Sequence, residues 1–160
     1  IIAPDIPMDP EEALPYLRGF CAAEMPDLII GTSMGAMYAQ QMRGFRKICV
    51  NPAFNMSRMS KVLKPGTFKY LNGRKDNAKE FRITKDTMQH YFQMERCQFD
   101  GITDFERENT WGLFGTGDDT TRGSYDIFRK HYPNASRFEG GHQLNEHALR
   151  TAVLPLIKTI

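Results

Sequence analysis

The sequence is poor in the features that mark several whole classes of protein. Cysteine occurs three times, an odd count without CxxC spacing, at Cys21, Cys49 and Cys97. This argues against a disulfide framework or a zinc knuckle and predicts reduced thiols and a cytoplasmic location. No apolar run approaches the ~20 residues needed to cross a bilayer, and residues 1–10 lack the basic start and apolar region of a signal peptide. No membrane partner is therefore expected.

A large excess of one charge is also missing. The formal net charge is +2, and the chain has no dense basic tract or nucleic-acid-binding motif, so no nucleic-acid partner is expected. The charge is nevertheless uneven, because residues 53–100 hold ten Lys and Arg against five Asp and Glu. Such a segment could face an acidic substrate, but a solvated surface is the favoured interpretation.

The chain has enough apolar residues for a core, with 41% hydrophobic residues in a length of 160, about one domain. Short apolar segments alternate with helical patterns, which predicts an α/β fold with a mostly parallel sheet flanked by helices. Strands are expected at 1–6, 27–31, 47–52, 110–117 and 135–141. Helices are expected at 8–25, capped by Asp9, at 33–44, at 121–132, and at 143–160, disturbed at Pro155.

Residues 53–100 interrupt this alternation. Helical patterns at 55–63 and 84–97 flank a polar, turn-rich stretch at 65–81. We therefore predict one domain spanning 1–160, from which 53–100 leaves the sheet as a helical and irregular, lid-like excursion. Four aromatic residues of this excursion are candidates to line an acyl pocket, although they could equally pack the excursion itself: Phe68, Tyr70, Tyr91 and Phe92.

The segment Gly31-Thr32-Ser33-Met34-Gly35 fits the pattern G-x-S-x-G between an expected strand and an expected helix. In this arrangement a sharp turn holds a serine clear of the sheet, and the crowded backbone favours glycine on both sides. The segment lacks the GxxxxGK[ST] of a phosphate-binding loop and the GxGxxG of a dinucleotide loop. The pattern therefore predicts that Ser33 is a nucleophile, against the alternative of a glycine-rich turn with a surface serine.

A serine nucleophile needs a base and a carboxylate that orients the base. Of four histidines, only His142 is expected in a loop after a strand, behind the pair Gly140-Gly141. The others fall in expected helices, and the spacing of His142 and His147 is poor for a metal site. Asp118 and Asp119 follow the strand before His142, and Asp118 is preferred because it comes directly after the glycine at the strand's end.

The sequence contains four short stretches that occur in this order: GTSMG, VNPAF, GTGDD and EGGHQ. Together they resemble the α/β-hydrolase superfamily, and most closely its small bacterial YqiA-type esterases. The resemblance covers nearly the whole chain and matches only loosely over 53–100. It implies that Ser33 is the nucleophile, Asp118 the orienting acid and His142 the base. The histidine stretch, Gly-Gly-His, is one residue shorter than the pattern of that group.

The expected activity is that of a serine carboxylesterase or thioesterase acting on a small-molecule ester or thioester through an acyl-enzyme. The N–H of Met34 would bind the oxyanion, and neither a metal nor an organic cofactor is needed. Two alternatives remain open at this point: an acyltransferase that uses the same residues, and a non-catalytic, hydrolase-like binding protein.

The start of the chain departs from that family, which begins with a strand and a His-Gly loop that supplies the second oxyanion donor. We therefore expect an upstream strand and loop to be absent from residues 1–160. Either an upstream segment of the same polypeptide or a second copy, in a homo-oligomer, would fill that place. The alternative is that this protein builds its oxyanion hole differently.

Overall fold

The computed structural model describes residues 1–56, 64–70 and 73–160. Most of the helix expected at 55–63 therefore lies outside the described residues. The chain divides into two compact units. The first unit comprises residues 1–25 and 56–97, and the second comprises residues 26–55 and 98–160.

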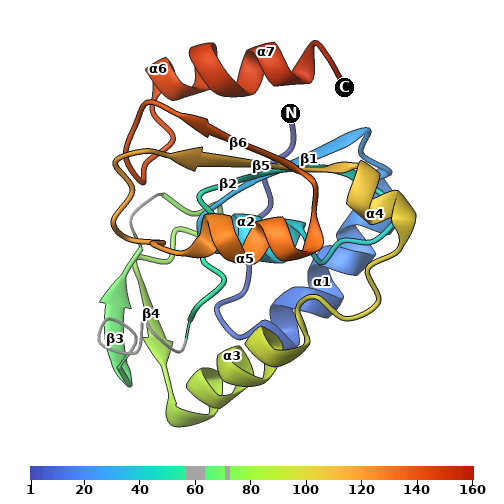
Figure 1. Cartoon of the computed structure of the whole chain (residues 1–160). Helices are drawn as coiled ribbons and strands as arrows, with labels where there is room; N and C mark the ends of the chain where they lie inside the picture. The colour runs from blue at the N-terminus through green and yellow to red at the C-terminus, as the bar shows by residue number, and fades with distance from the viewer. Residues whose placement is uncertain (57–63, 71–72) are drawn as a thin grey trace. The chain divides into compact units, whose positions relative to one another are not determined.

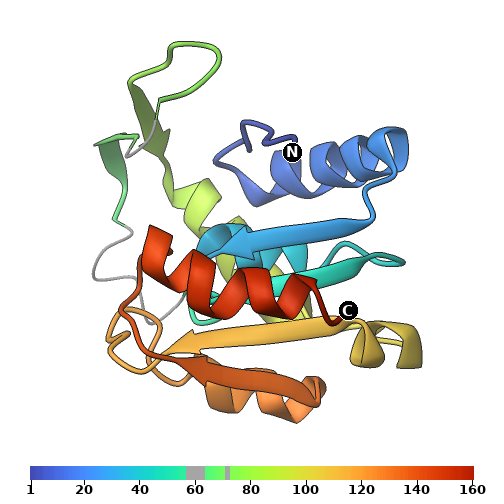
Figure 2. The same ribbon diagram turned by 90° about the horizontal axis from the view of Figure 1, so that it is seen from above.

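The second unit is built on a parallel sheet with the strand order β1-β2-β5-β6. Each neighbouring pair runs in the same direction, with Gly31 opposite Cys49 and Cys49 opposite Gly112. The carboxyl ends of the strands therefore meet at one edge, as their arrowheads show in Figure 2. The predicted α/β class with a mostly parallel sheet is confirmed. The strands are β1 (Leu28–Thr32), β2 (Arg46–Val50), β5 (Thr110–Gly115) and β6 (Asn134–Phe138).

Helices cover both faces of this sheet (Figure 1). One face carries α2 (Met34–Ala39) and α5 (Ser124–His131), and α4 (Asp104–Glu108) precedes β5. The other face carries the terminal helix, made of α6 (Glu146–Ala148), the π-helical turn η2 (Leu149–Val153) and α7 (Leu154–Ile157). The expected disturbance at Pro155 is confirmed, because proline has no N–H to continue the α-helical pattern and the π turn lies directly before it.

The strands contribute alternate side chains to two apolar layers. Ile48 and Val50 of β2 are fully buried in the layer beneath the terminal helix, together with Val153. On the opposite face, Phe128 of α5 is fully buried at the centre of an aromatic cluster, with ring centroids 4.8 Å from Tyr132 and 5.5 Å from Phe114. The period of two along each strand, which places side chains on alternate faces, produces both layers.

A buried ionic group lies at the amino ends of the strands. The ammonium of Lys47 is fully buried and donates a 2.8 Å hydrogen bond to the carbonyl of Met42. Burial lowers the pKa of Lys47 to about 8, against the opposing charge of Glu106. Glu106 accepts hydrogen bonds from Thr103 and from the N–H of Gly44, and these outweigh its burial, so that its pKa falls to about 2. These contacts offset the cost of removing the two charges from water, because a buried charge left without a partner is strongly destabilising.

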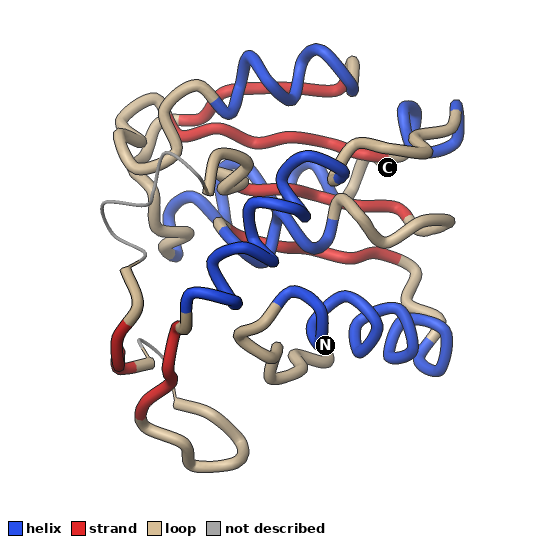
Figure 3. Tube along the Cα trace, turned by 90° about the horizontal axis from the view of Figure 1, so that it is seen from below, coloured by secondary structure: helices blue, strands red, loops and turns tan. Residues whose placement is uncertain are grey.

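The first unit contains α1 (Pro10–Glu24), α3 (Lys85–Cys97) and an antiparallel pair, β3 (Gly66–Lys69) with β4 (Glu80–Ile83) (Figure 3). The predicted start of α1 is confirmed, since the side chain of Asp9 accepts the N–H of Glu11 at 3.0 Å. Two expectations are wrong. Residues 1–6 form no strand, and the side chains of Ile1 and Ile2 are exposed. The polar stretch 65–81 contributes to a strand pair rather than only to turns.

Residues of α1 and α3 are linked by a cluster around His90. Its Nδ1 lies 2.8 Å from Oδ1 of Asp9, and its Nε2 lies 3.6 Å from Oε2 of Glu11. The hydrogen bond to Asp9, helped by the nearby carboxylates, raises the pKa of His90 above its usual 6.5. None of the helices in the described ranges combines the length and apolar character needed to cross a membrane.

Replacing Phe128 tests the aromatic layer. We expect Phe128→Ala to lower the free energy of unfolding by about 3–5 kcal/mol, because it leaves a cavity that the rings of Phe114 and Tyr132 can fill only partly. Phe105→Ala is the matched control, since Phe105 is 44% exposed and its loss should cost less than about 1 kcal/mol. Urea unfolding followed by circular dichroism measures both, and equal losses would contradict the assignment of Phe128 to the core.

His90 should make the stability of the protein depend on pH. Because its pKa is raised in the folded state, its contribution is complete below about pH 6.5 and is lost as the pH rises through the folded-state pKa. His90→Gln should therefore destabilise the protein more at pH 5.5 than at pH 8.5. Urea titrations of both proteins at the two pH values measure this difference, and His147→Gln, at an exposed site, is the control.

Candidate active site

Ser33 lies on the turn between β1 and α2 in a strained backbone conformation. Its φ of 52° and ψ of −119° lie in a region that non-glycine residues rarely adopt, at a cost of order 1–3 kcal/mol. Surrounding hydrogen bonds hold the turn in place: the N–H of Ser33 donates to the carbonyl of Val50, and its carbonyl accepts the N–H of Ala53. The serine side chain is only partly covered, at the carboxyl edge of the sheet.

The two glycines of the turn differ in the space available for a side chain. A Cβ atom at Gly31 would lie 2.4 Å from the carbonyl oxygen of Gly35 and 2.7 Å from Cα of Ala36, closer than any real contact. A Cβ atom at Gly35 would meet no described atom within 4 Å. The expectation that both positions must be free of a side chain is therefore wrong for Gly35. The crowding is between position 31 of the strand and the backbone of Gly35 and Ala36, at the start of the helix.

The structure brings Ser33, His142 and Asp118 together, although they lie far apart in the sequence. The Oγ of Ser33 is 2.9 Å from Nε2 of His142, and Nδ1 of His142 is 3.1 Å from each carboxylate oxygen of Asp118. Because a carboxylate can only accept, Nδ1 carries the ring proton, and Nε2 is free to accept the hydroxyl proton of Ser33. This tautomer is the one that a general base acting on Ser33 requires.

Asp118 is held as an anion. Its side chain is 5% exposed, and burial alone would raise its pKa. Hydrogen bonds from the hydroxyl of Thr121, from His142 and from the backbone N–H of Thr121 outweigh the burial, so that the pKa of Asp118 lies below its usual 3.8. The alternative, Asp119, is exposed and pairs with Arg122 on the surface. The structure therefore places Asp118, rather than Asp119, against the histidine.

The loop that carries His142 lies against the loop that carries Asp118. The N–H of Gly117 donates to the carbonyl of Gly140 at 2.9 Å, and a Cβ atom at Gly115 would lie 2.6 Å from that same oxygen. The glycines after β5 and β6 thus allow two backbones to approach each other closely. This approach sets the distance between the acid and the imidazole.

Asn51 lies at the site, although no role was predicted for it from the sequence motifs. It follows β2 with a φ of 45° and is 1% exposed. Its side chain contacts the loops of both Asp118 and His142 through three hydrogen bonds. The stretch VNPAF contains Asn51 and could have indicated it as a site residue. An asparagine after a strand is also common in ordinary turns, however, so no role was predicted for it.

The remaining histidines lie elsewhere. His131 ends α5 and stacks on Phe99, with 4.0 Å between ring centroids, and burial lowers its pKa. His147 lies in α6, and His90 belongs to the first unit. Among the residues with described positions, no three His, Cys, Asp or Glu side chains form a group able to hold a metal ion.

The four aromatic candidates for an acyl pocket all belong to the first unit. Phe68 and Tyr70 pack on Phe81, with ring centroids 5.7 and 4.8 Å away. Tyr91 is 1% exposed and donates its hydroxyl to the carbonyl of Met8, and Phe92 is partly buried on the same helix. These contacts give Phe68, Tyr70 and Tyr91 a packing role within the first unit.

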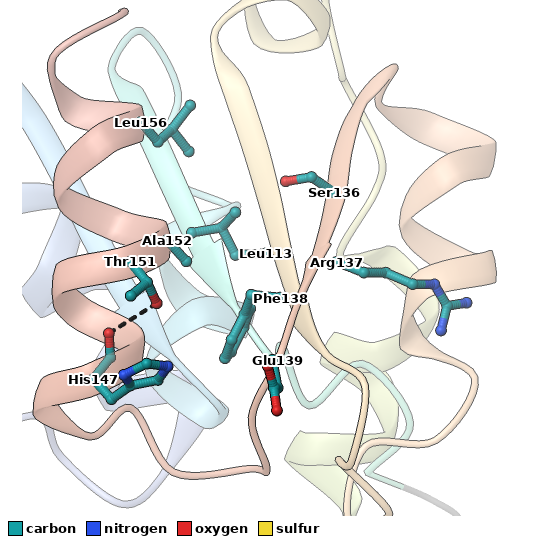
Figure 4. A pocket seen from close by; sticks show the side chains of 9 residues that line it. All are labelled: Leu113, Ser136, Arg137, Phe138, Glu139, His147, Thr151, Ala152 and Leu156. Carbon is teal, nitrogen blue, oxygen red and sulfur yellow. Dashed lines mark hydrogen bonds between the residues drawn. The ribbon is translucent and has the colours of Figure 1, made fainter.

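Two hollows open on the second unit. One of about 300 Å³ adjoins the candidate site and is lined by Asn51, Gly115 and Asp118, among others. A larger one, of about 540 Å³, lies between β6 and the terminal helix (Figure 4). Phe138 and the side chains of the helix point into it, whereas Arg137 points to the other face of β6, where its guanidinium stacks on Tyr125 at 4.2 Å. No residue of the Ser33–His142–Asp118 group lines the larger hollow.

Comparison with known proteins identifies solved structures that have a similar fold. No protein-family model matches the sequence, and no curated protein matches it in sequence. The structure is similar to that of the esterase domain of a Rhodothermus marinus protein, with a TM-score of 0.61 and 18% identity over 92% of this chain. The chain spans 66% of that domain, just under two thirds.

Two further solved structures are more distant. They are MGS-MChE2, an α/β-hydrolase enzyme from a lagoon-sediment metagenome (TM-score 0.49, 12% identity, 97% of this chain and 73% of that one), and the peroxisomal α/β-hydrolase Lpx1 of Saccharomyces cerevisiae (TM-score 0.46, 13% identity, 94% and 56%). At these identities the similarity concerns the fold alone.

The unequal environments of the two glycines give a matched test of the turn. Gly31→Ala should prevent folding or destabilise the protein by more than about 3 kcal/mol, because backbone atoms that cannot move aside occupy the Cβ position. Gly35→Ala should be tolerated, with a change below about 1 kcal/mol. Thermal unfolding of both variants measures the difference, and a stable Gly31→Ala protein would show that the turn is looser than described.

Proposed function

We propose that this protein is a serine hydrolase that cleaves a carboxylic ester or thioester through a covalent acyl-enzyme. One observation carries the proposal: the unbroken hydrogen-bonded chain from the Oγ of Ser33 through both ring nitrogens of His142 to the carboxylate of Asp118. A serine, a histidine and an aspartate with these distances and this proton arrangement are what nucleophilic catalysis at a carbonyl requires.

In the first half of the reaction the Oγ of Ser33 attacks the substrate carbonyl carbon while its proton passes to Nε2 of His142. The oxyanion that forms would accept a hydrogen bond from the N–H of Met34, the residue after the nucleophile. As the tetrahedral intermediate collapses, His142 returns the proton to the leaving alcohol or thiol. The acyl group then remains on Ser33.

In the second half a water molecule attacks the acyl-enzyme, and His142 takes the proton of that water. The acid is released and the proton returns to Ser33. The imidazole is positively charged in the tetrahedral intermediate of each half-reaction, and the carboxylate of Asp118 stabilises that charge at 3.1 Å. The low pKa of Asp118 keeps the carboxylate ionised at neutral pH, so that it favours the charged imidazole throughout.

The fold and the order of the motifs support the same proposal. The similar domain from Rhodothermus marinus is described as an esterase domain, and the four stretches around the candidate site follow the order of the YqiA-type esterases. We therefore include this chain in the α/β-hydrolase superfamily, with a small-molecule ester or thioester as the substrate class and a cytoplasmic location. Transfer of the acyl group to an alcohol or thiol would use the same first half-reaction.

The test is covalent labelling with a fluorophosphonate, which reacts rapidly only with an activated serine. We expect labelling at Ser33 and hydrolysis of p-nitrophenyl butyrate. Ser33→Ala should lower kcat by roughly 10⁴–10⁶, and His142→Ala by a similar factor, with little further loss in the double variant because the residues act as a unit. Intact mass spectrometry and steady-state kinetics provide the readouts.

Two matched controls accompany this test. Ser136→Ala removes an exposed serine of the same unit, and Asp119→Asn removes the neighbouring carboxylate that pairs with Arg122. Both should retain near-wild-type rates, whereas Asp118→Asn should lose roughly 10⁴ in kcat through the wrong tautomer. If the wild-type protein is neither labelled nor active on esters of any chain length, the hydrolase-like binding protein becomes the better interpretation.

A further inference from the structure

The turn after β2 connects all three segments that carry the candidate catalytic residues. The carbonyl of Val50 accepts the N–H of Ser33, and the N–H of Ala53 donates to the carbonyl of Ser33. Between them, the side chain of Asn51 reaches the two other segments. Three residues of this stretch, Val50, Asn51 and Ala53, therefore contact the serine turn, the loop of the acid and the loop of the base.

Asn51 uses its whole side-chain amide in this arrangement. Its Oδ1 accepts the N–H of Gly115 at 2.7 Å, where β5 passes into the loop of Asp118. Its Nδ2 donates to the carbonyls of Gly141 and His142, each at 3.0 Å. An amide offers one acceptor and two N–H donors, and in Asn51 each of them has a backbone partner in a loop that carries a candidate catalytic residue.

From this geometry we propose that Asn51 is a positioning residue, which fixes the imidazole of His142 between Ser33 and Asp118. The inference rests on the proposed hydrolase function, because it concerns the same site. Asn51 does not touch the reacting atoms, and it acts by holding the backbone on both sides of the Cα atom of His142.

His142 needs such support because of its own loop. It follows two glycines, which lose the most conformational freedom on ordering, and α6 begins only at Glu146. Its side chain is 23% exposed. A shift of ~1 Å in a catalytic group can lower a rate by about 10²-fold, so a clamp on the carbonyls of residues 141 and 142 bears directly on catalysis.

The backbone of Asn51 explains why this residue type suits the position. A φ of 45° is left-handed, a conformation that asparagine tolerates better than most residues. Glycine tolerates it too, so Asn51→Gly keeps the backbone conformation and removes only the side chain. Aspartate is isosteric, so Asn51→Asp keeps an acceptor for the N–H of Gly115 and removes the donors to Gly141 and His142. The two variants thus separate the contact with the acid loop from the contacts with the base loop.

We expect both variants to lower kcat for p-nitrophenyl butyrate by about 10- to 100-fold, with KM changed by less than about 3-fold and fluorophosphonate labelling of Ser33 slowed in proportion. Phe128→Leu is the control for stability, since it weakens the same unit within the aromatic layer and should leave kcat near the wild-type value. A purely structural role for Asn51 would give both Asn51 variants the behaviour of this control.

The tautomer of His142 provides a readout that does not need activity. In the wild-type protein the ¹⁵N shifts of the ring, assigned by comparison with His142→Gln, should show the proton on Nδ1. Asn51→Gly and Asn51→Asp should shift the population towards the Nε2-protonated form, because the bond to Asp118 that selects the tautomer is weakened.

The outcomes separate this inference from the proposed function. If the wild-type protein hydrolyses esters and both Asn51 variants keep its kcat and its tautomer, the positioning role is wrong and the hydrolase proposal stands. If the wild-type protein neither hydrolyses nor labels, the hydrolase proposal fails, and the tautomer of the variants still decides whether Asn51 positions His142.

Discussion

The common direction of four strands is the constraint on which the candidate site depends. Because β1, β2, β5 and β6 all run the same way, the turns after them meet at one edge, and side chains from positions 33, 51, 118 and 142 become neighbours. An antiparallel strand in the same place would send one of these turns to the opposite edge. The chemistry is thus distributed over several short loops, each positioned by the rigid strand before it.

The two ends of the sheet divide stability and chemistry between them. The amino ends hold the buried Lys47, hydrogen-bonded to the carbonyl of Met42, near the charge of Glu106. The carboxyl ends hold a strained serine and glycines that permit close backbone approach. Cys49, between them, is fully buried, and its burial, only partly opposed by the charge of Lys47, raises the pKa of the thiol to about 12, so that it stays unreactive.

The sequence predicted the candidate catalytic residues whose role requires a particular residue type at a particular place. Ser33 on a glycine-flanked turn, a histidine after a glycine pair and an acid after a strand could be predicted, because each needs a particular place at the end of a strand. Asp118 was preferred to Asp119 by one position only, and the structure supplies the reason in the hydrogen bonds from Thr121. The strand predicted at residues 1–6 is not formed, because an apolar pattern by itself specifies neither pairing nor burial, and Ile1 and Ile2 are exposed. Asn51 was missed because its role depends on two loops that lie about sixty and ninety positions away.

The space beside Gly35 changes what the glycine pattern means. Only the first glycine is enforced by contact with the backbone, whereas the position of Gly35 has room for a Cβ atom. In this protein the strand glycine two positions before the serine is the more constrained of the two, because backbone atoms of Gly35 and Ala36, which no rearrangement of side chains can move aside, occupy the place of its Cβ atom.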